Sequence, residues 1–308
     1  MPYRCMKKIC FITTCSASKA QEITLGARIQ DVLCGNQRSV LQSWLSLVQS
    51  TAPVVPLWNL YSGRAIRIMK NVAKVLDAPL FVISAGLGLV DICERRPRYD
   101  LTISGKGPSS VLTRINDDTF DTTAWWTGVN HNDSAPIANL IRRNADTLFV
   151  LALSFRYFAM VRRDLETLES QWLENLRITG LKAQFDTPLA PCILPYDGRL
   201  NGPDSPIPGT LSDFPQRCAV HYTEHCISGF GLKADRAAVF EVIKDMAWPL
   251  HSSGKKLSDD EIINLLRTEF EKTGFMKTRM LRHFRGTLRV ACEQKRFSYL
   301  YDRAIGVD

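Results

Sequence analysis

Residues 80–105 contain the residue types from which α/β proteins build a ligand pocket. Their sequence, LFVISAGLGLVDICERRPRYDLTISG, passes from a short apolar run into a glycine-spaced turn and then reaches a Tyr-Asp pair. Gly86 and Gly88 would let the backbone approach a ligand closely, and Asp100 would present a carboxylate to solvent or substrate. We therefore expect residues 84–90 to form a pocket wall. The same spacing also fits an ordinary strand-to-helix turn, and the alternative for Asp100 is a turn cap.

Two other predicted strands also end in polar residues. Residues 8–14 are typical of a strand, and the small polar turn TTCSASKA that overlaps its end could hold an anion. Residues 147–153 are typical of a buried strand with a second polar group at its end. Open α/β sheets bind ligands beyond the carboxyl ends of their strands. Cys15 could act there as a nucleophile, although the sequence identifies no partner histidine. The candidate substrate-binding residues at these strand ends are Cys15, Ser16, Ser84, Gly86, Gly88, Ser154 and Arg156.

The order of predicted elements indicates an α/β fold. Strand-like and helix-like runs alternate through the first half of the chain, at residues 8–14, 37–50, 61–76, 80–84 and 147–153. Continuous apolar runs are typical of strands that are buried on both faces. We therefore expect a central, mainly parallel sheet flanked by helices. Residues 104–135 are polar, so we expect a long surface excursion there that contains Trp125 and Trp126.

A change in composition predicts two domains. Residues 186–215 contain too many prolines and glycines for regular structure, so they form either a linker or a functional loop. Beyond this segment the sequence is helix-like. We expect an α/β domain over residues 1–195 and a helical domain over residues 210–308.

The helical domain contains a capped helix followed by a basic stretch. Ser258 and Glu261 match the capping box, which predicts a helix from Asp259 to about Thr273. Residues 274–303 then carry eight Lys and Arg against two acids. Short basic amphipathic helices are typical of helix-turn-helix DNA-binding modules, although a solvated helical face is the alternative. The candidate DNA-binding cations are Lys277, Arg279, Arg282, Arg285, Lys295 and Arg296.

The composition of the chain indicates which partners, cellular location and cofactors to expect. The 308 residues carry 39 Lys and Arg against 31 Asp and Glu, a net charge of +8 that favours a polyanionic partner. The sequence shows neither a bilayer-length apolar run nor a signal-peptide cleavage site, so we expect a cytoplasmic protein with no membrane partner. The nine cysteines are scattered, which predicts reduced thiols. Neither a phosphate-binding P-loop nor a full dinucleotide fingerprint occurs, so no cofactor is expected.

Four possible metal ligands lie close together in the sequence. Cys218, His221, His225 and Cys226 fall within nine residues, and the first three share one helical face. Structural zinc sites normally take four ligands from two separated pairs, and four ligands on one helix cannot all converge on one ion. We therefore predict no metal site.

Several short motifs resemble those of a known group of enzymes. They are TTCSASK, LYSGR at residues 60–64, ISAGLGLV followed by YDLTI, and the late ACEQKRF. Together they resemble bacterial proteins found near anti-phage systems, and the central motif is similar to the cores of archaeosine synthase and of YaaA-type peroxide-stress proteins. The resemblance covers residues 1–160 better than the tail. It implies a uracil-DNA-glycosylase-like fold and a function like that of antiviral DNA glycosylases, which excise glucosylated hydroxymethylcytosine from phage DNA.

The resemblance also implies roles for individual residues. A glycosylase extracts its nucleotide from the duplex, and cleavage of the N-glycosidic bond then develops positive charge on the sugar. A carboxylate would stabilise that charge and orient water, a role that the resemblance gives to Asp100, with Asp91 second. Donors from Ser16, Ser84 and the amides around Gly86 would stabilise the departing base. The side chains expected to contact base, sugar or phosphate are Tyr61, Tyr99, Tyr157, Arg64 and Arg156.

Other functions remain open. The likeness to archaeosine synthase allows a transferase or lyase that acts on a modified base in tRNA, and a non-catalytic protein that binds damaged DNA is a third hypothesis. No His-Pro-Ser segment like that of the uracil-excising enzymes follows residues 147–153, so the group that stabilises the leaving base is not identified. For the glycosylase hypothesis the expected partner is double-stranded modified phage DNA, without an obligatory protein partner.

Overall fold

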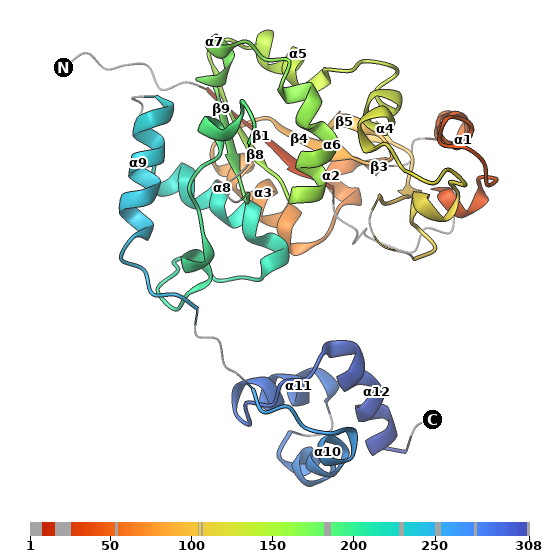
Figure 1. Cartoon of the computed structure of the whole chain (residues 1–308), viewed down its shortest axis with the longest axis vertical. Helices are drawn as coiled ribbons and strands as arrows, with labels where there is room; N and C mark the ends of the chain where they lie inside the picture. Colours follow the sequence, from red (N-terminus) through yellow and green to blue (C-terminus); the bar gives the residue numbers. More distant parts are fainter. Residues whose placement is uncertain are drawn as a thin grey trace. The chain divides into compact units, whose positions relative to one another are not determined.

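The chain forms two compact units. The computed structural model describes residues 8–15, 26–52, 55–103, 105, 107–181, 186–227, 231–249, 254–273 and 276–306 (Figure 1). The first unit is Met1–Pro249 and the second is Leu250–Asp308. Each unit has a hydrophobic core of its own.

A five-stranded sheet forms the centre of the first unit (Figure 1). The strands of the chain are β1 (Lys8–Thr14), β2 (Ala27–Arg28), β3 (Val55–Pro56), β4 (Leu80–Ser84), β5 (Gly88–Asp91), β6 (Arg95–Arg96), β7 (Tyr99–Asp100), β8 (Thr147–Ala152) and β9 (Leu176–Thr179). The sheet has the order β5-β4-β1-β8-β9, in which β5 is antiparallel to β4 and all other neighbours are parallel. The remaining short strands pair as β2 with β7 and β3 with β6. The predicted α/β fold with a mainly parallel sheet is confirmed.

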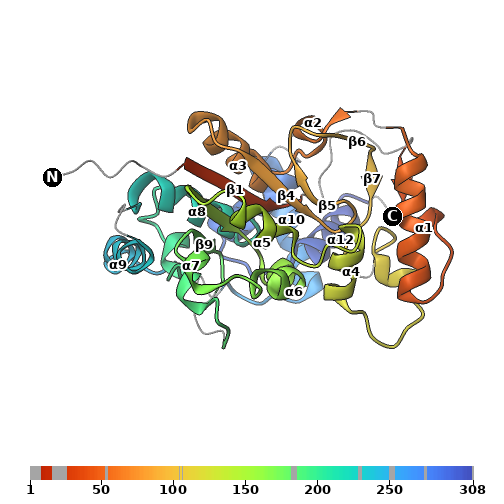
Figure 2. The same ribbon diagram turned by 90° about the horizontal axis from the view of Figure 1, so that it is seen from above.

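Helices cover both faces of this sheet. The helices of the first unit are α1 (Gln37–Ser50), α2 (Leu57–Leu60), α3 (Arg64–Val75), α4 (Thr122–Val129), α5 (Pro136–Arg142), α6 (Phe155–Leu165), α7 (Ser170–Leu173), α8 (Phe214–His225) and α9 (Leu232–Ile243). Helices α3 and α8 pack on each other and on β1 and β8, while α4, α5 and α6 form a second group on the opposite face (Figure 2). The chain moves along the sheet in one direction from β1 to β4 and in the other direction to β8 and β9, and connections of the usual right-handed kind then place their helices on opposite faces.

The register aligns the ends of the parallel strands. Thr13 of β1 lies opposite Val82 of β4 and opposite Ala152 of β8, and Ala152 lies opposite Thr179 of β9. The middle of β1 is fully buried, as expected for a strand covered on both faces. The carboxyl ends of four neighbouring strands therefore meet at one edge of the sheet.

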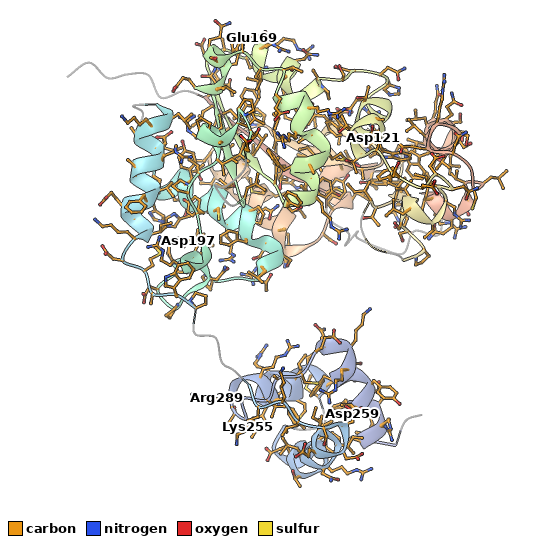
Figure 3. The ribbon with its side chains drawn as sticks, viewed as in Figure 1. Asp121, Glu169, Asp197, Lys255, Asp259 and Arg289 are labelled. Carbon is orange, nitrogen blue, oxygen red and sulfur yellow. The ribbon has the colours of Figure 1, made fainter. Side chains whose placement is uncertain are left out.

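The expected surface excursion over residues 104–135 is wrong in its second half. Asp121 is the N-cap of α4, and its carboxylate accepts hydrogen bonds from Thr123 N and Ala124 N at 2.9 and 3.0 Å (Figure 3). Trp125 and Trp126 on this helix are completely buried. The sequence did not indicate this burial, because the two tryptophans have polar neighbours in the sequence. Those polar residues lie in the turns before and after the helix and not on its inner face.

The boundary between the units also differs from the expected one. Helices α8 and α9 follow the Pro/Gly-rich residues 186–215, yet both belong to the first unit. Helix α8 packs on α3, β8 and β9. Buried Arg177 of β9 forms an ion pair with Asp235 of α9 at 2.7 Å, and Tyr222 of α8 donates to the same carboxylate at 2.6 Å. The expected division into 1–195 and 210–308 is therefore replaced by Met1–Pro249 and Leu250–Asp308.

One buried arginine explains how residues 197–213 can be ordered with only two short 3-10 helices, Gly198–Asn201 and Leu211–Asp213. Arg217 of α8 is completely buried and pairs with Asp213 at 2.9 Å. Its guanidinium also donates to the carbonyl oxygens of Leu200, Ile207 and Thr210, each at 3.0 Å. A planar group with five donors can satisfy several loop carbonyls at once. The loop is thus folded around a side chain of the first unit instead of linking two domains.

The second unit is a group of three helices, α10 (Asp259–Thr273), α11 (Lys277–Gly286) and α12 (Gln294–Ala304). Its core contains Leu266, Met280, Phe284 and Leu300, all of them completely buried. The predicted capping box at the start of α10 is confirmed, since Glu261 N donates to Ser258 Oγ at 3.3 Å and Ser258 N donates to the Glu261 carboxylate at 2.7 Å. Three helices around one apolar centre give this unit its own core.

We predict that the Arg177–Asp235 pair stabilises only the first unit. Asp235→Ala leaves a buried guanidinium without its counterion, which should lower the free energy of unfolding by about 3–5 kcal/mol. Tryptophan fluorescence in urea measures this directly, because all six tryptophans precede residue 250. The exposed pair of Lys244 with Glu241 provides the control, and Glu241→Ala should change stability by less than about 1 kcal/mol. Equal effects of the two variants would contradict the stabilising role of the buried pair.

Candidate functional site

Polar residues meet at the carboxyl edge of the sheet. Cys15 follows β1, Ser84 ends β4, and Ser154 precedes α6, two residues after β8. Cys15 N donates to Ile83 O at 3.0 Å, which joins the ends of β1 and β4. Ligands of open α/β sheets bind at this edge. We therefore take it as the candidate site of the first unit.

A chain of hydroxyl groups is anchored at the end of β4. Ser84 Oγ accepts hydrogen bonds from Gly86 N at 3.2 Å and from Leu87 N at 3.0 Å. These two bonds use both lone pairs of the oxygen, so the Ser84 proton donates to Tyr99 Oη at 2.7 Å. Tyr99 Oη is in turn hydrogen-bonded to Tyr61 Oη at 2.9 Å. Two backbone amides thus fix the position of three hydroxyl groups.

A thiol lies beside these hydroxyl groups. Cys15 is half-buried, and its Sγ is 3.1 Å from Tyr157 Oη on α6. Burial raises the pKa of Tyr61, Tyr99 and Tyr157, and the neighbouring sulfur of Cys15 raises it further. The three phenols therefore stay protonated at neutral pH. Neutral donors at a buried site are suited to stabilise negative charge that develops on a departing group.

The glycines that were predicted to line the pocket have structural roles in a β-hairpin. Residues 85–87 turn the chain from β4 directly into antiparallel β5. A Cβ on Gly86 would lie 3.0 Å from the rings of Trp44 and Tyr99. Gly88 has φ +77°, and a Cβ there would lie 2.4 Å from Asn130 Oδ1. Both positions require glycine because of close packing and backbone conformation.

Two tryptophans that the sequence analysis did not assign to the site hold this hairpin turn. Trp44 Nε1 donates to Gly86 O and Trp125 Nε1 donates to Ala85 O, both at 2.7 Å. Each indole lies about forty residues away from its acceptor in the sequence, so no local spacing could reveal the contact. The turn that anchors Ser84 is thereby fixed from two other helices, α1 and α4.

Asp100 has one engaged and one unengaged carboxylate oxygen. It lies in β7, where its Cα partner across the ladder is Arg28 of β2. Its Oδ2 accepts from Ser109 Oγ at 2.6 Å and from Gln30 Nε2 at 3.4 Å. Within the described part of the chain, Oδ1 has no hydrogen-bond donor. Because side chains alternate along a strand, Asp100 points to the side of β7 opposite to Tyr99.

Asp91 lies far from this edge of the sheet. It is the last residue of β5, where it lies opposite Phe81 near the amino end of β4. Its Oδ1 accepts from Cys93 N at 2.8 Å, as a turn-capping carboxylate does. The expectation that Asp91 could serve as a second catalytic carboxylate is corrected by this position.

The remaining predicted site residues of the first unit differ in whether they form hydrogen bonds or ion pairs within the protein. Arg64 forms an ion pair with Asp213 at 2.9 Å and also donates to the carbonyl of Pro208, so it ties α3 to a loop. Ser154 and Arg156 are exposed, and Arg156 forms no hydrogen bond or ion pair with the residues that the structure describes. Ser16 lies outside the described residues.

The predicted DNA-binding cations of the second unit fall into two groups. Lys277 pairs with Asp302 at 2.7 Å, and Arg296 pairs with Asp259 at 2.6 Å, so these two cations connect helices. Arg285 donates to Cys292 O at 3.0 Å and is otherwise exposed. No hydrogen bond or ion pair to another described residue engages the exposed cations Arg279, Arg282 and Lys295.

The Cys/His cluster is a buried polar contact of α8. His221 is completely buried, and its Nδ1 is 2.8 Å from Tyr196 Oη, while its Nε2 has no partner among the described residues. Cys226 Sγ lies 3.8 Å from the same Nδ1. Across the described ranges, no group of three or more His, Cys, Asp and Glu side chains is arranged to hold a metal ion.

Comparison with known proteins does not place the chain in a family. No protein-family model, no curated protein and no solved structure matches it. Among the described helices, none has the length and apolar character that crossing a membrane requires. Function is therefore argued from the geometry of the site.

We predict that His221 makes the first unit sensitive to acid. Burial and the neighbouring His225 lower the pKa of His221 to about 4 from an ordinary value of 6.5. A lowered pKa in the folded state stabilises the fold above pH 6.5, and this stability is lost as the pH falls toward 4. The loss should reach at most about 3 kcal/mol.

Urea unfolding between pH 7 and pH 4, followed by tryptophan fluorescence, tests this prediction. His221→Gln removes the titrating ring and should flatten the dependence of stability on pH. His131→Gln, at an exposed position, should leave the dependence unchanged. A steep loss of stability that persists in the His221 variant would show that another group is responsible.

Proposed function

We propose that the chain is a DNA glycosylase that hydrolyses the N-glycosidic bond of a modified cytosine in phage DNA and leaves an abasic site, as an antiviral defence. The proposal rests on one observation, the placement of Asp100 directly after Tyr99 in β7. The Tyr99 hydroxyl belongs to the anchored chain at the carboxyl edge, and the Asp100 carboxylate has an unengaged oxygen on the other side of the strand. One short strand thus carries a neutral donor and a carboxylate, the two groups that this hydrolysis needs, on its opposite sides, so a nucleotide would have to bind around the end of β7 to meet both.

The chemistry of the reaction fits these two groups. The bond between the sugar C1′ and the base nitrogen breaks, and its electron pair leaves with the base. The sugar becomes positively charged, and a carboxylate such as that of Asp100 can stabilise it. A water oxygen then bonds to C1′ and passes a proton to the carboxylate. Ser109 and Gln30 hold Oδ2, which leaves Oδ1 to orient that water.

The hydroxyl chain would act on the departing base. Negative charge that develops on the base needs donors that are already oriented before the reaction begins. Tyr99 and Tyr61 remain protonated because burial raises their pKa values, and Ser84 holds Tyr99 in place. The sequence lacks the His-Pro-Ser segment that stabilises the leaving base in uracil-excising enzymes. In this proposal the two phenols take over that role.

A second function, base transfer or lysis on a modified base in tRNA, is favoured by the position of Cys15. A half-buried thiol at a strand end, 3.1 Å from a phenol, could carry a covalent intermediate as a nucleophile. Simple hydrolysis does not need this thiol. The two functions therefore predict different effects for Cys15→Ser, which should be nearly neutral for hydrolysis and severe for transfer.

Asp100→Asn should lower the rate of base release by roughly 10²–10⁴-fold, because the amide can neither accept a proton nor stabilise a cation. Asp91→Asn is the matched control and should act like the unchanged protein, since Asp91 lies at the opposite end of the sheet. Mass spectrometry of small products released from phage DNA with modified cytosines measures the rate. Alkali-labile strands should appear in parallel.

Three outcomes of that experiment would contradict the glycosylase proposal. Unchanged release by the Asp100 variant would exclude the carboxylate role. Tight tRNA binding without base release from any DNA would favour base transfer or lysis. Binding of modified DNA without product would favour a non-catalytic recognition protein.

Tyr99→Phe should lower kcat by roughly 10²-fold, because it removes an oriented donor to the departing base. KM should change little, since the ring itself remains. The loss should shrink for substrates whose base forms a more stable anion, a dependence that a purely structural role would not produce. Tyr222→Phe, another buried tyrosine but one bonded to Asp235, is the control and should leave kcat unchanged. An equal loss for all leaving groups would argue against the proposed role.

A further inference from the structure

Charges in the second unit are separated between its helices. Helix α10 begins with Asp259, Asp260 and Glu261, while α11 has the sequence KTRMLRHFRG and contains no acidic residue. An unmixed cationic helix is unfavourable by itself, because like charges one turn apart repel each other. A segment that keeps such a composition on its surface is suited to a polyanionic partner.

Helix α11 has one apolar face and one cationic face. Met280 and Phe284 are completely buried in the core of the unit. Arg279, Arg282 and Arg285 are exposed at intervals of three residues, so they follow the outer side of the helix. The guanidinium groups of Arg279 and Arg282 form no hydrogen bond or ion pair with the described chain. The outer face therefore presents the guanidinium groups of Arg279 and Arg282 without partners in the part of the chain that the structure describes.

Two hollows adjoin this cationic face. One, of about 460 Å³, is lined by Thr278, Leu281, Arg282, Arg285 and Gly286. The other, of about 510 Å³, also includes Arg285 and adds Lys256 and Arg296, with Glu293 as its acidic member. The Glu293 carboxylate accepts from Arg296 N at 3.0 Å, so part of its charge is engaged at the start of α12. Arg285 thus connects a groove along α11 with a second basic hollow.

A short backbone contact brings two more cations to the second hollow. Lys255 N donates to Arg289 O at 2.7 Å, and Ala291 N donates back to Lys255 O at 2.9 Å. Lys255 and Arg289 are both exposed and lie near each other (Figure 3). They flank Gly254, Lys256 and Val290, which line the hollow. The cationic surface therefore continues from α11 onto the segment that precedes α12.

We infer that α11 enters the major groove of duplex DNA, where Arg279 and Arg282 contact guanine edges, while Lys255, Lys256 and Arg289 bind flanking phosphates. Helix α10 ends at Thr273 and α11 begins at Lys277, a spacing that suits the second helix of a helix-turn-helix. This inference rests on the proposed function in taking DNA as the polyanion.

The chemistry of the surface favours duplex DNA over other polyanions. The major groove of B-DNA is about 12 Å wide and admits an α-helix, whereas the major groove of A-form RNA is too narrow for one. Arginine forks match the O6 and N7 atoms of guanine. Thr278, Arg279 and Arg282 on the outer face are polar or charged, which does not suit insertion into a lipid layer. A ten-residue helix with an exposed cationic face can enter the groove without unfolding of the unit.

The test uses the full-length chain and an unmodified DNA duplex, so that binding is measured apart from base release. Arg279→Ala combined with Arg282→Ala should weaken binding at least tenfold, measured by fluorescence anisotropy over a salt series. Methylation of guanine N7 by dimethyl sulfate reports the major groove directly. The unchanged protein should protect specific guanines, and the double alanine variant should not. Arg267→Ala combined with Arg303→Ala removes the same charge from exposed positions on α10 and α12 and should leave both readouts unchanged.

A conservative pair of variants separates groove contacts from phosphate contacts. Arg279→Lys combined with Arg282→Lys keeps the charge but loses the planar fork, so N7 protection should weaken while the salt dependence stays. Lys255→Ala combined with Arg289→Ala should instead reduce the slope of log K against log salt by about 1.8 if each cation contacts one phosphate. N7 protection should persist in that variant.

Several results would overturn this inference without affecting the proposed reaction. They are absence of N7 protection by the unchanged protein, equal losses in the Arg267/Arg303 control, or binding of an RNA duplex at least as tight as that of DNA. Base release from modified DNA would still stand in each case. Conversely, groove protection without release of any base would contradict the proposed reaction and leave the DNA-binding assignment of α11 intact.

Discussion

The hydroxyl group of Ser84 is fixed by two amides of the turn that follows it, and the chemistry proposed for the first unit depends on this attachment. The amides of Gly86 and Leu87 both donate to Ser84 Oγ, so the hydroxyl proton of Ser84 can only be donated to Tyr99 Oη. The turn in turn depends on distant side chains, since the Trp44 indole binds the Gly86 carbonyl at 2.7 Å. Tyr99 and Asp100 are adjacent in β7. The hydrogen bond that positions the Tyr99 phenol therefore also restricts the position of the Asp100 carboxylate. A hydrogen-bond donor that is already oriented need not be reoriented when negative charge develops beside it, so little free energy is spent on rearranging the site.

The cations of the second unit fall into two groups according to whether they have acidic partners. Lys277 and Arg296 have acidic partners one helix away, so their charge is neutralised locally and joins helices. Arg279 and Arg282 are exposed on α11 and have no such partners in the described chain. Exposed ion pairs contribute little to stability in water. The two groups of cations therefore differ little in what they contribute to the stability of the unit. They differ in whether their charge is available to a ligand.

The sequence predicted the main sheet because continuous apolar runs with polar ends are a local signal. Residues 8–14, 80–84 and 147–153 were placed correctly, and so was the capping box of Ser258. Contacts between distant residues gave no such signal. The burial of Trp125, the bond from Trp44 to the hairpin turn, and the ion pair that joins α9 to β9 each depend on the folded arrangement. The role of Asp91 was misjudged for a related reason, because the sequence did not show that β5 returns antiparallel and carries this residue to the other end of the sheet.

Separation of the two units has a consequence for specificity. Cations that bind phosphates supply affinity that depends on salt and hardly on sequence. If α11 contacts guanine edges as inferred, these contacts would favour a site, but they would not examine a modification on a cytosine that has left the duplex. Under the proposed function, discrimination between modified and ordinary cytosine would come from groups at the carboxyl edge of the sheet, where the half-buried Cys15 and Tyr157 lie 3.1 Å apart. A sugar carried by the base would add hydroxyl groups that need partners, and the exposed Arg156 beside Tyr157 is a suitable donor from the same helix.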